Sequence, residues 1–206
     1  ADPLGPENPI IFAVGPLTSR FPMASKTVAM FKSPHTGNLG ESHAGGRSAI
    51  AIRMAGYGAI VIQGASAMPV YLVIGDDAVA FRDASALWGT RSSYTTGDVL
   101  RKRESGSGYR TIMRIGRAGE KQVSYACVIT ETYRHFGRLG LGAVFGSKQL
   151  KSIVVRGRRN LEAADRRGYR KVYDTIYERA TVSPLMRKYH EIGTPMNVIP
   201  LDAIGA

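Results

Sequence analysis

Short apolar runs rich in β-branched and aromatic residues recur along the first 157 residues, and Gly, Pro or Asp bounds most of them. Runs of this length and composition are typical of β-strands. They predict strands over 10–15, 26–31, 58–64, 69–75, 79–84, 110–116, 122–129 and 151–157. Asp76 and Asp77 separate two of these runs and favour a hairpin turn. The segment 92–104 instead predicts a helix, with Leu100 on its inner side and charged residues outward.

The pattern changes after Gly157. Apolar and aromatic residues then recur at intervals of three and four, which predicts an amphipathic helix over 164–180. A second helix is expected to begin at Ser183 as N-cap, with Pro184 in its first turn, and to stop at Gly193. We therefore expect an α+β fold with a β-rich domain over 1–157, a boundary at 158–164, and the start of an all-α domain up to 206.

One long stretch shows neither the hydrophobic period of a helix nor that of a strand. FKSPHTGNLGESHAGGRSAI, residues 31–50, consists mainly of small and polar residues, with large apolar ones only at its ends and at Leu39. The absence of a helical or strand period predicts a loop. Its four glycines indicate either a flexible segment or a place where the backbone approaches another group closely.

Two pairs of short matches suggest an internal duplication. FAVGPL at 12–17 parallels MRIGRA at 113–118, and GAIVIQG at 58–64 parallels KSIVVRG at 151–157. A glycine-rich stretch lies between the paired runs of each half, at 40–46 and at 137–148. A base domain built from two intertwined copies of one unit would hold two similar groups, or one group of nearly twofold shape.

Charge and cysteine content narrow the function classes. The 28 Lys and Arg against 16 Asp and Glu give a net charge of +12, which favours nucleic acid, an acidic membrane surface or a multiply phosphorylated ligand. The single cysteine, Cys127, excludes an internal disulfide and a cysteine-ligated cluster held within this chain. We see neither a signal peptide nor an apolar run of membrane-spanning length, and we expect a cytoplasmic protein.

The two glycine-rich stretches are accompanied by cations. Glycine lets several backbone N–H groups converge on an oxyanion, and Lys or Arg supplies the charge. The candidate cations are Lys26, Lys32, Arg134, Arg138 and Lys148. These glycines could equally make turns between strands, so both interpretations stay open. GRLGLG at 137–142 does not match the dinucleotide-binding fingerprint, and GSK at 146–148 lacks the spacing of a P-loop.

Six motifs occur together in order: DPLGPENPIIFAVGPLT, FKSPHTGNLGESHAGG, MAGYGAIVIQGASAMPVYLVI, DASALWG, IGRAGE and GRLGLGAVFGSKQLKSIVVRG. Through them the chain resembles the N-terminal domain of the aldehyde ferredoxin oxidoreductase family from Asp2 to Gly157. GTPMNVIPLDAIGA at the other end is similar to the start of that family's second, helical domain. The resemblance implies that the N-terminal part of the base domain, and most of the helical domain, lie outside these 206 residues.

The resemblance also implies a cofactor and its ligands. A tungsten or molybdenum ion would be held by two pterins, each with a phosphate, and a magnesium ion would bridge the phosphates. The magnesium ligands would be the backbone carbonyls of His43 and His135, where the best-known relatives have asparagine and alanine. Lys26 would replace an arginine of the family. Residues that would contact the pterins are Lys26, Ala44, Gly45, Gly46, Arg134, Phe136, Gly137 and Arg138.

The expected whole protein oxidises aldehydes or related carbonyl substrates and passes electrons through a 4Fe–4S cluster to ferredoxin. The cluster ligands and the catalytic residues would lie outside this chain, which contains no expected catalytic residue and would be inactive alone. A homodimer is possible, and no nucleic-acid or membrane partner is expected. Two alternatives stay open: a basic nucleic-acid-binding module, and a structural relative that binds no cofactor.

Overall fold

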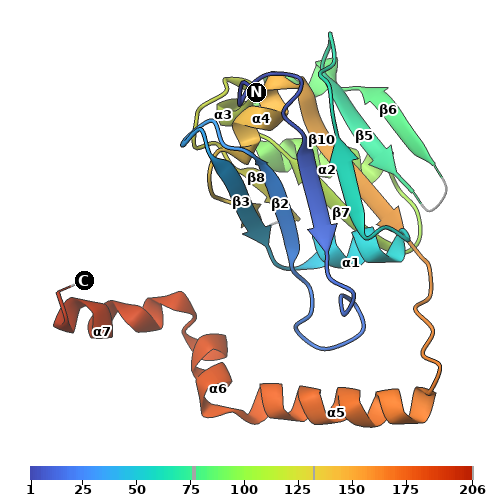
Figure 1. Ribbon diagram of the computed structural model, residues 1–206, viewed down its shortest axis with the longest axis vertical. Coiled ribbons are helices and arrows are strands. Elements are labelled where there is room, and N and C mark those ends of the chain that lie inside the picture. Colours follow the sequence, from blue (N-terminus) through green and yellow to red (C-terminus); the bar gives the residue numbers. More distant parts are fainter. Residues whose placement is uncertain (76–77, 132, 206) are drawn as a thin grey trace. The chain divides into compact units, whose positions relative to one another are not determined.

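The structure is a computed structural model that describes residues 1–75, 78–131 and 133–205, with the side chains of 185 and 187–189 excepted. The chain divides into two compact units (Figure 1). The first comprises Ala1–Arg20 and Ala24–Leu161, and the second comprises Phe21–Met23 and Glu162–Ala206. The expected turn at Asp76 and Asp77 lies outside the described residues.

The first sheet of the first unit, sheet A, is antiparallel throughout. Its spatial order is β3-β2-β1-β4. The strands are β1 (Ile10–Val14), β2 (Thr27–Lys32), β3 (Leu39–Ala44) and β4 (Ala59–Ile62). Ile10 and Phe12 face inward and are fully buried, whereas the alternate residues Ile11 and Ala13 face outward and are only half-buried. This alternation is what a sheet with one face on the core requires.

The second sheet, sheet B, has the order β6-β5-β10-β7-β8-β9. Only β5 and β10 are parallel to each other. The strands are β5 (Val70–Ile74), β6 (Val79–Asp83), β7 (Tyr109–Arg114), β8 (Val128–Thr130), β9 (Arg134–Phe136) and β10 (Leu150–Gly157). β10 is buried on both faces, which explains its continuous apolar run Ile153–Val155.

The duplication is visible in the topology. β1-β2-β3-α1-β4 and β7-β8-β9-α4-β10 pair in the same order and with the same directions. The helix between the third and fourth strands is α1 (Arg47–Met54) in the first repeat and α4 (Leu141–Ser147) in the second. The two repeats are intertwined, since α1 packs on β7 and β10 of sheet B while Phe145 of α4 meets Phe12 of β1 with ring centroids 6.2 Å apart.

A close backbone contact fixes α1 against sheet B. A Cβ at Gly157, the last residue of β10, would lie 1.9 Å from the backbone nitrogen of Ala55, which follows α1. No side chain fits there. The two sheets, the repeated strand order and this packing of α1 together confirm the predicted α+β class with a duplicated, intertwined base.

The stretch 31–50 is not a loop, so that prediction was wrong. It contains β3, whose small residues Gly40, Ser42 and Ala44 are buried in alternation, and the first half of α1. Small residues form a strand here because β2 and the core supply the bulk against which they pack. The expected strand over 122–129 was also largely wrong, since only 128–130 is a strand. The preceding residues are turns, with Gln122 at a φ of +55°.

The expected helices are confirmed. α2 (Ser93–Arg103) begins after Ser92, whose hydroxyl accepts a hydrogen bond from the Tyr94 N–H, and Leu100 on it is fully buried. Two short helices complete the first unit, the 3-10 helix η1 (Ser85–Leu87) and α3 (Arg117–Glu120).

The second unit is helical, as expected. It consists of α5 (Arg166–Val182), α6 (Pro184–Glu191), the 3-10 helix η2 (Thr194–Asn197) and α7 (Val198–Ala203). The Ser183 hydroxyl accepts a hydrogen bond from the Met186 N–H, as an N-cap does. Among the described helices of both units, we find none with the length and apolar character needed to cross a membrane.

Candidate functional site

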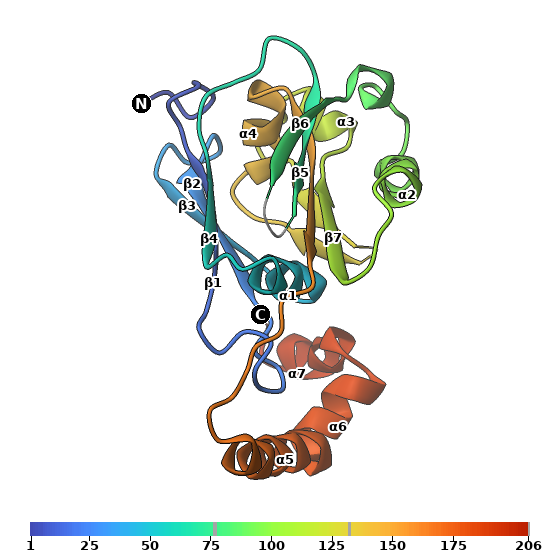
Figure 2. The same cartoon turned by 90° about the vertical axis from the view of Figure 1, so that its right-hand side faces the viewer.

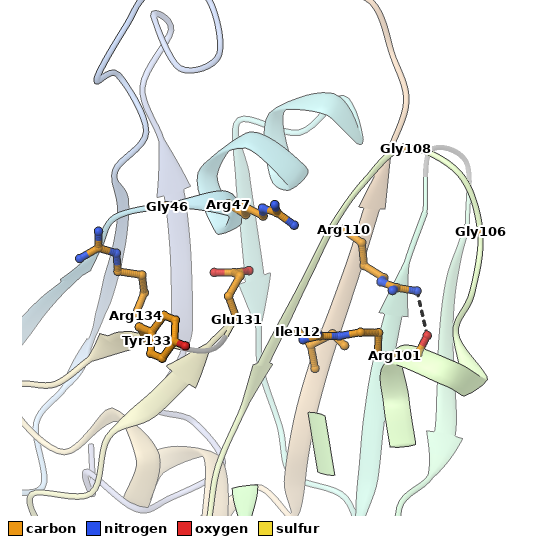
Figure 3. A pocket seen from close by; sticks show the side chains of 10 residues that line it. All are labelled: Gly46, Arg47, Arg101, Gly106, Gly108, Arg110, Ile112, Glu131, Tyr133 and Arg134. Carbon is orange, nitrogen blue, oxygen red and sulfur yellow. Dashed lines mark hydrogen bonds between the residues drawn. The ribbon is translucent and has the colours of Figure 1, made fainter. Parts of the chain in front are cut away.

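A hollow of about 450 Å³ opens between the two repeats (Figure 3). Three segments line it: the start of α1, the turn that leads into β9, and the end of α2 with the beginning of β7. The lining residues are Gly46, Arg47, Arg101, Gly106, Gly108, Arg110, Ile112, Glu131, Tyr133 and Arg134. Four of the ten are arginines and one is acidic, so the hollow favours an anionic occupant.

The end of β3 and the start of β9 meet at this hollow. β3 and β9 lie next to each other, and the Arg138 N–H donates a 3.2 Å hydrogen bond to the Ser42 hydroxyl. A Cβ at Gly46 would lie 3.3 Å from Cγ of Arg134. The glycine-rich stretch of the first repeat and the RHFGR segment of the second therefore form one site, although about ninety residues separate them.

Gly45 and Gly46 at the start of α1 leave room for a ligand. A Cβ at Gly45 would meet no atom within 4 Å. Gly46 has φ 97° and ψ −146°, a conformation that side-chain-bearing residues rarely adopt. No side-chain hydrogen bond caps α1 at its N-terminal end, where Gly46 and Arg47 line the hollow. Uncapped N–H groups at a helix start can bind an oxyanion.

The glycines of the second stretch have another purpose. Cβ atoms at Gly140, Gly142 and Gly146 would lie 2.0, 2.6 and 1.9 Å from the backbone carbonyl oxygens of Ser124, Cys127 and Gly119 respectively. These glycines let α4 pack directly on the chain of residues 119–127. This close packing is neither the phosphate binding nor the strand turns that the sequence left open, whereas Gly45 has open space beside it and Gly46 lines the hollow.

Arg110, on the α2 side of the hollow, is held by backbone carbonyls. Nη1 of Arg110 donates hydrogen bonds to the carbonyl oxygens of Arg101 and Glu104, at 3.0 and 2.6 Å. Burial lowers the pKa of the Arg110 guanidinium, and the neighbouring Arg101 and Arg156 lower it further. Cations that destabilise one another in this way are stabilised by a bound anion.

Glu131 shapes the turn that carries Arg134. Its carboxylate accepts hydrogen bonds from the hydroxyls of Thr111 and Thr130, and its backbone carbonyl accepts one of 2.8 Å from Nη1 of the buried Arg114. The backbone of Glu131 has a φ of +50°, which is strained for a non-glycine residue. Figure 3 shows its side chain and that of Arg134 on the same side of the hollow.

Of the eight residues expected to contact pterin, Gly46 and Arg134 line the hollow and the other six do not. Lys26, Gly137 and Arg138 are exposed, and Lys26 directly precedes Thr27, which pairs with Ala44 at the strand end that leads to Gly45. The side chains of Ala44 and Phe136 are buried in the core, where Phe136 packs edge-on against Phe12 with centroids 5.4 Å apart. Only the backbone of Ala44 and Phe136 can therefore face a ligand.

His43 and His135 lie on β3 and β9, which are edge strands in the described part of the chain. Edge strands present alternate backbone carbonyls away from the sheet. The His43 side chain contacts a residue of its own strand, since its Nε2 lies 2.5 Å from Oε1 of Glu41. The described residues contain no group of three His, Cys, Asp or Glu side chains able to hold a metal ion. Magnesium accepts carbonyl oxygens as ligands, so a magnesium site at His43 and His135 would have to use their backbone.

Two of the candidate cations are structural instead. Nζ of Lys32 donates to the backbone oxygen of Ala1 at 2.5 Å. Nζ of the buried Lys148 donates to the backbone oxygens of Pro6 and Gly64, at 2.9 and 2.8 Å, and burial lowers its pKa. Neither lysine lines the hollow.

The sequence analysis missed several lining residues. Arg47 carries a local signal, because it follows two glycines at the start of a helix. Arg101 belongs to the charged residues of α2 that were taken as solvent-facing, and Arg110, Glu131 and Tyr133 reach the hollow only because sheet B aligns β7 beside β8. No spacing along the chain reveals that alignment.

Comparison with known proteins identifies relatives of the first unit. The family model described as aldehyde ferredoxin oxidoreductase, N-terminal domain, matches residues 1–157. The tungsten-containing aldehyde ferredoxin oxidoreductase of Pyrococcus horikoshii is 40% identical over 185 residues, which cover 89% of this chain and 30% of that protein. The protein of the same name from Thermococcus kodakarensis is 43% identical over 170 residues, 82% of this chain and 28% of that protein.

Two further relatives have different names. The aliphatic sulfonate oxidoreductase, WOR-like subunit, of Pyrococcus furiosus is 36% identical over 166 residues, 76% of this chain and 26% of that protein. Among solved structures, the active site complex BamBC of benzoyl coenzyme A reductase with 1,5-dienoyl-CoA matches with a TM-score of 0.80 and 32% identity. That match covers 89% of this chain and 29% of the other. The chain thus spans less than a third of the length of these relatives.

Proposed function

Because the chain belongs to the aldehyde ferredoxin oxidoreductase family, we propose that its first unit is the base on which a longer oxidoreductase binds a tungsten or molybdenum cofactor with two phosphorylated pterins. The observation that carries the proposal is that the end of β3 in the first repeat and the start of β9 in the second meet at one arginine-lined hollow. A ligand with phosphate groups matches the four arginines of this hollow.

The residues present fit such a group. The N–H groups beside Gly45 and Gly46 would bind phosphate oxygens, and Arg134, Arg138 and Lys26 would supply the compensating charge. The carbonyls of His43 and His135, on neighbouring edge strands, would bind the magnesium ion between the phosphates. Glu131 would hold the turn so that Arg134 stays beside Gly46.

The bound metal would supply the chemistry, a two-electron exchange with an aldehyde or related carbonyl substrate. This chain would bind the cofactor, orient it and exclude water from its phosphates. The single cysteine cannot ligate a 4Fe–4S cluster, so the cluster ligands would come from elsewhere in the longer protein, as would contacts to ferredoxin and to a second subunit.

The test uses the full-length protein produced in tungstate medium. In Gly45→Leu the new side chain enters open space at the site, and in Arg134→Ala a charged donor is lost. We expect each to lower tungsten and pterin per chain about tenfold or more, since one charge-assisted hydrogen bond contributes about 1.5–3 kcal/mol. Metal analysis and the fluorescence of oxidised pterin measure the content.

Matched controls are Gly58→Leu, where a side chain also enters open space, and Arg117→Ala on the exposed surface of α3. Neither residue lines the hollow, so both should retain normal tungsten and pterin. Full cofactor content in Gly45→Leu and Arg134→Ala, with unchanged thermal stability, would refute the assignment of the site.

A further inference from the structure

Arg114, the last residue of β7, is among the largest side chains that are fully buried. Its Nε donates a 2.6 Å hydrogen bond to the backbone oxygen of Ser93, and its Nη1 donates one of 2.8 Å to the backbone oxygen of Glu131. Nη1 also donates to the backbone oxygen of Ile112, at 3.2 Å. One side chain thus joins the first turn of α2 to the turn that leads into β9.

The charge of Arg114 is buried without a counter-ion. In the part of the chain that the structure describes, no carboxylate lies within ion-pair distance of this guanidinium. Burial lowers its pKa, and the nearby charge of Arg101 lowers it further. A buried charge is destabilising unless hydrogen bonds compensate for the lost water. Here backbone carbonyls are the acceptors, so the position of each carbonyl is tied to the guanidinium.

The first repeat shows that the strand framework does not require an arginine at this position. In the alignment of FAVGPL with MRIGRA, Arg114 corresponds to Ala13. Ala13 pairs with Ala59 of β4. Arg114 pairs with Ser152 at the corresponding place of β10. The arginine therefore belongs to a feature that only the second repeat has.

The helix above Arg114 is adapted to it. Figure 2 shows α2 beside β7, on which it packs. Gly97 lies inside α2, and a Cβ there would lie 2.9 Å from both Cζ and Nε of Arg114. Glycine inside a helix is less favourable than alanine. The room that it leaves for the guanidinium explains its presence at this position.

The turn that Arg114 holds contributes Glu131, Tyr133 and Arg134 to the hollow, whereas Arg114 itself does not line it. The positive φ of Glu131 has to be maintained by its surroundings. The hydrogen bond from Arg114 to its carbonyl does so from the side of α2. The last turn of α2 carries Arg101, which lines the opposite side of the hollow. The guanidinium thus connects both sides of the site.

We propose that Arg114 is a positioning residue of the cofactor site. Its two donor nitrogens hold the Glu131 carbonyl against α2, and this keeps Arg134 beside Gly46, where it can bind a phosphate oxygen. Gly97 belongs to the same arrangement, because it lets the guanidinium lie between α2 and β7. The inference rests on the proposed function for the identity of the ligand, whereas the effect on the turn is measurable without any ligand.

The first experiment is hydrogen exchange of the full-length protein, read by mass spectrometry on β9, which begins at Arg134. Arg114→Lys keeps the buried charge but donates from one nitrogen instead of two. We expect the β9 amides to exchange about tenfold faster than in the original protein, relative to those of β1. Unchanged relative exchange would overturn the positioning role, whatever the cofactor content.

Lys151→Met is the control for lost stability alone. It removes another buried cation, which contacts Glu120 and does not line the hollow. We expect the exchange of β9 relative to β1, and the tungsten and pterin content, to stay normal in this variant. The same changes in Lys151→Met as in Arg114→Lys would show a general loss of stability and would contradict the proposal.

The second experiment keeps the arginine and measures tungsten and pterin in full-length Gly97→Ala produced in tungstate medium. The new methyl group displaces the guanidinium from its carbonyl acceptors. We expect the content to fall at least about threefold, and at most by the roughly tenfold expected for Arg134→Ala, because the displaced turn forfeits what Arg134 contributes. The matched control, Val99→Ala, also places alanine in α2, at a residue that is 40% exposed, and should keep full content.

The combined results separate this inference from the proposed function. Full content in Gly97→Ala, with loss in Arg134→Ala, would refute the positioning role alone. Full content in both variants would refute the proposed function, and the positioning role with it. If Arg114→Lys does not fold, Gly97→Ala decides, since it leaves the buried charge in place.

Discussion

Gly45 and Gly46 are neighbours in sequence but differ in what a side chain would do to them. Gly46 has a φ of +97° and its Cβ would crowd Arg134, whereas a Cβ at Gly45 meets open space. Gly46→Ala should therefore lower the free energy of unfolding by about 1–3 kcal/mol, the cost of such backbone strain. Gly45→Ala should stay within about 0.5 kcal/mol of the original protein. Urea denaturation of both variants measures the difference, and equal stabilities would contradict the assigned backbone conformation.

Tyr71 is a single residue whose environment in the folded protein raises its pKa. Its hydroxyl donates a 2.7 Å hydrogen bond to Oε1 of Glu104, and Arg82 lies 3.3 Å from the same oxygen. Burial, with the hydrogen bond and negative charge of Glu104, raises the pKa of Tyr71 from 10.0 to about 12. The folded state thus binds the phenolic proton more tightly than the unfolded state does.

The stability from this proton is complete below pH 10 and is lost as the pH rises from 10 to 12. We expect the difference in unfolding free energy between the original protein and Tyr71→Phe to shrink over that interval. Chemical denaturation at a series of pH values measures it. A difference that stays constant up to pH 12 would mean that Tyr71 titrates normally in the folded protein.

Among the elements, α3 is held on sheet B chiefly by a buried ion pair. Nζ of Lys151 on β10 contacts Oε1 of Glu120, with side-chain exposures of 0% and 5%. Oε2 of Glu120 also accepts a 3.0 Å hydrogen bond from the Gly89 N–H. The pair joins the turn after η1, the helix and the central strand, so its removal affects three elements at once.

Lys151→Met leaves the Glu120 carboxylate buried without its cation. We expect a loss of about 3–5 kcal/mol in unfolding free energy, as for other buried pairs from which one partner is removed. Adding Glu120→Leu should recover part of the loss, because the uncompensated charge disappears. A double-mutant cycle by denaturant unfolding measures the coupling, and purely additive losses would show that the two side chains act independently.

At the scale of the whole molecule, the proposed role of this chain is to bind the cofactor, while the longer protein supplies the other parts of the oxidoreductase. It has one cysteine, and its described residues contain no side-chain metal cluster. We expect the 206-residue chain to show no aldehyde-dependent reduction of a viologen dye, even when produced with tungstate. The full-length protein assayed in parallel is the positive control, and turnover by the 206-residue chain would refute the division of roles proposed here.

Local sequence was sufficient for much of the fold. Val, Ile, Tyr and Phe runs predicted most strands, the three-to-four spacing predicted α5, and parallel motifs predicted the duplication, because these signals depend on residues close together in the chain. It was insufficient for β3 and α1, since small buried residues such as Gly40 and Ser42 give no hydrophobic period. Their burial depends on what packs against them.

For the candidate site too, local sequence determined some features and the tertiary structure decided others. The sequence by itself determined the family and the glycine-rich stretches, but of the four arginines that line the hollow it indicated only Arg134. Only the tertiary structure decided that Gly45 faces open space while Gly146 packs on Gly119, and that Lys148 is tied to Pro6 while Arg110 lines the hollow. A residue's type sets which contacts it can make, but which atoms it meets depends on the pairing of strands that are distant along the chain.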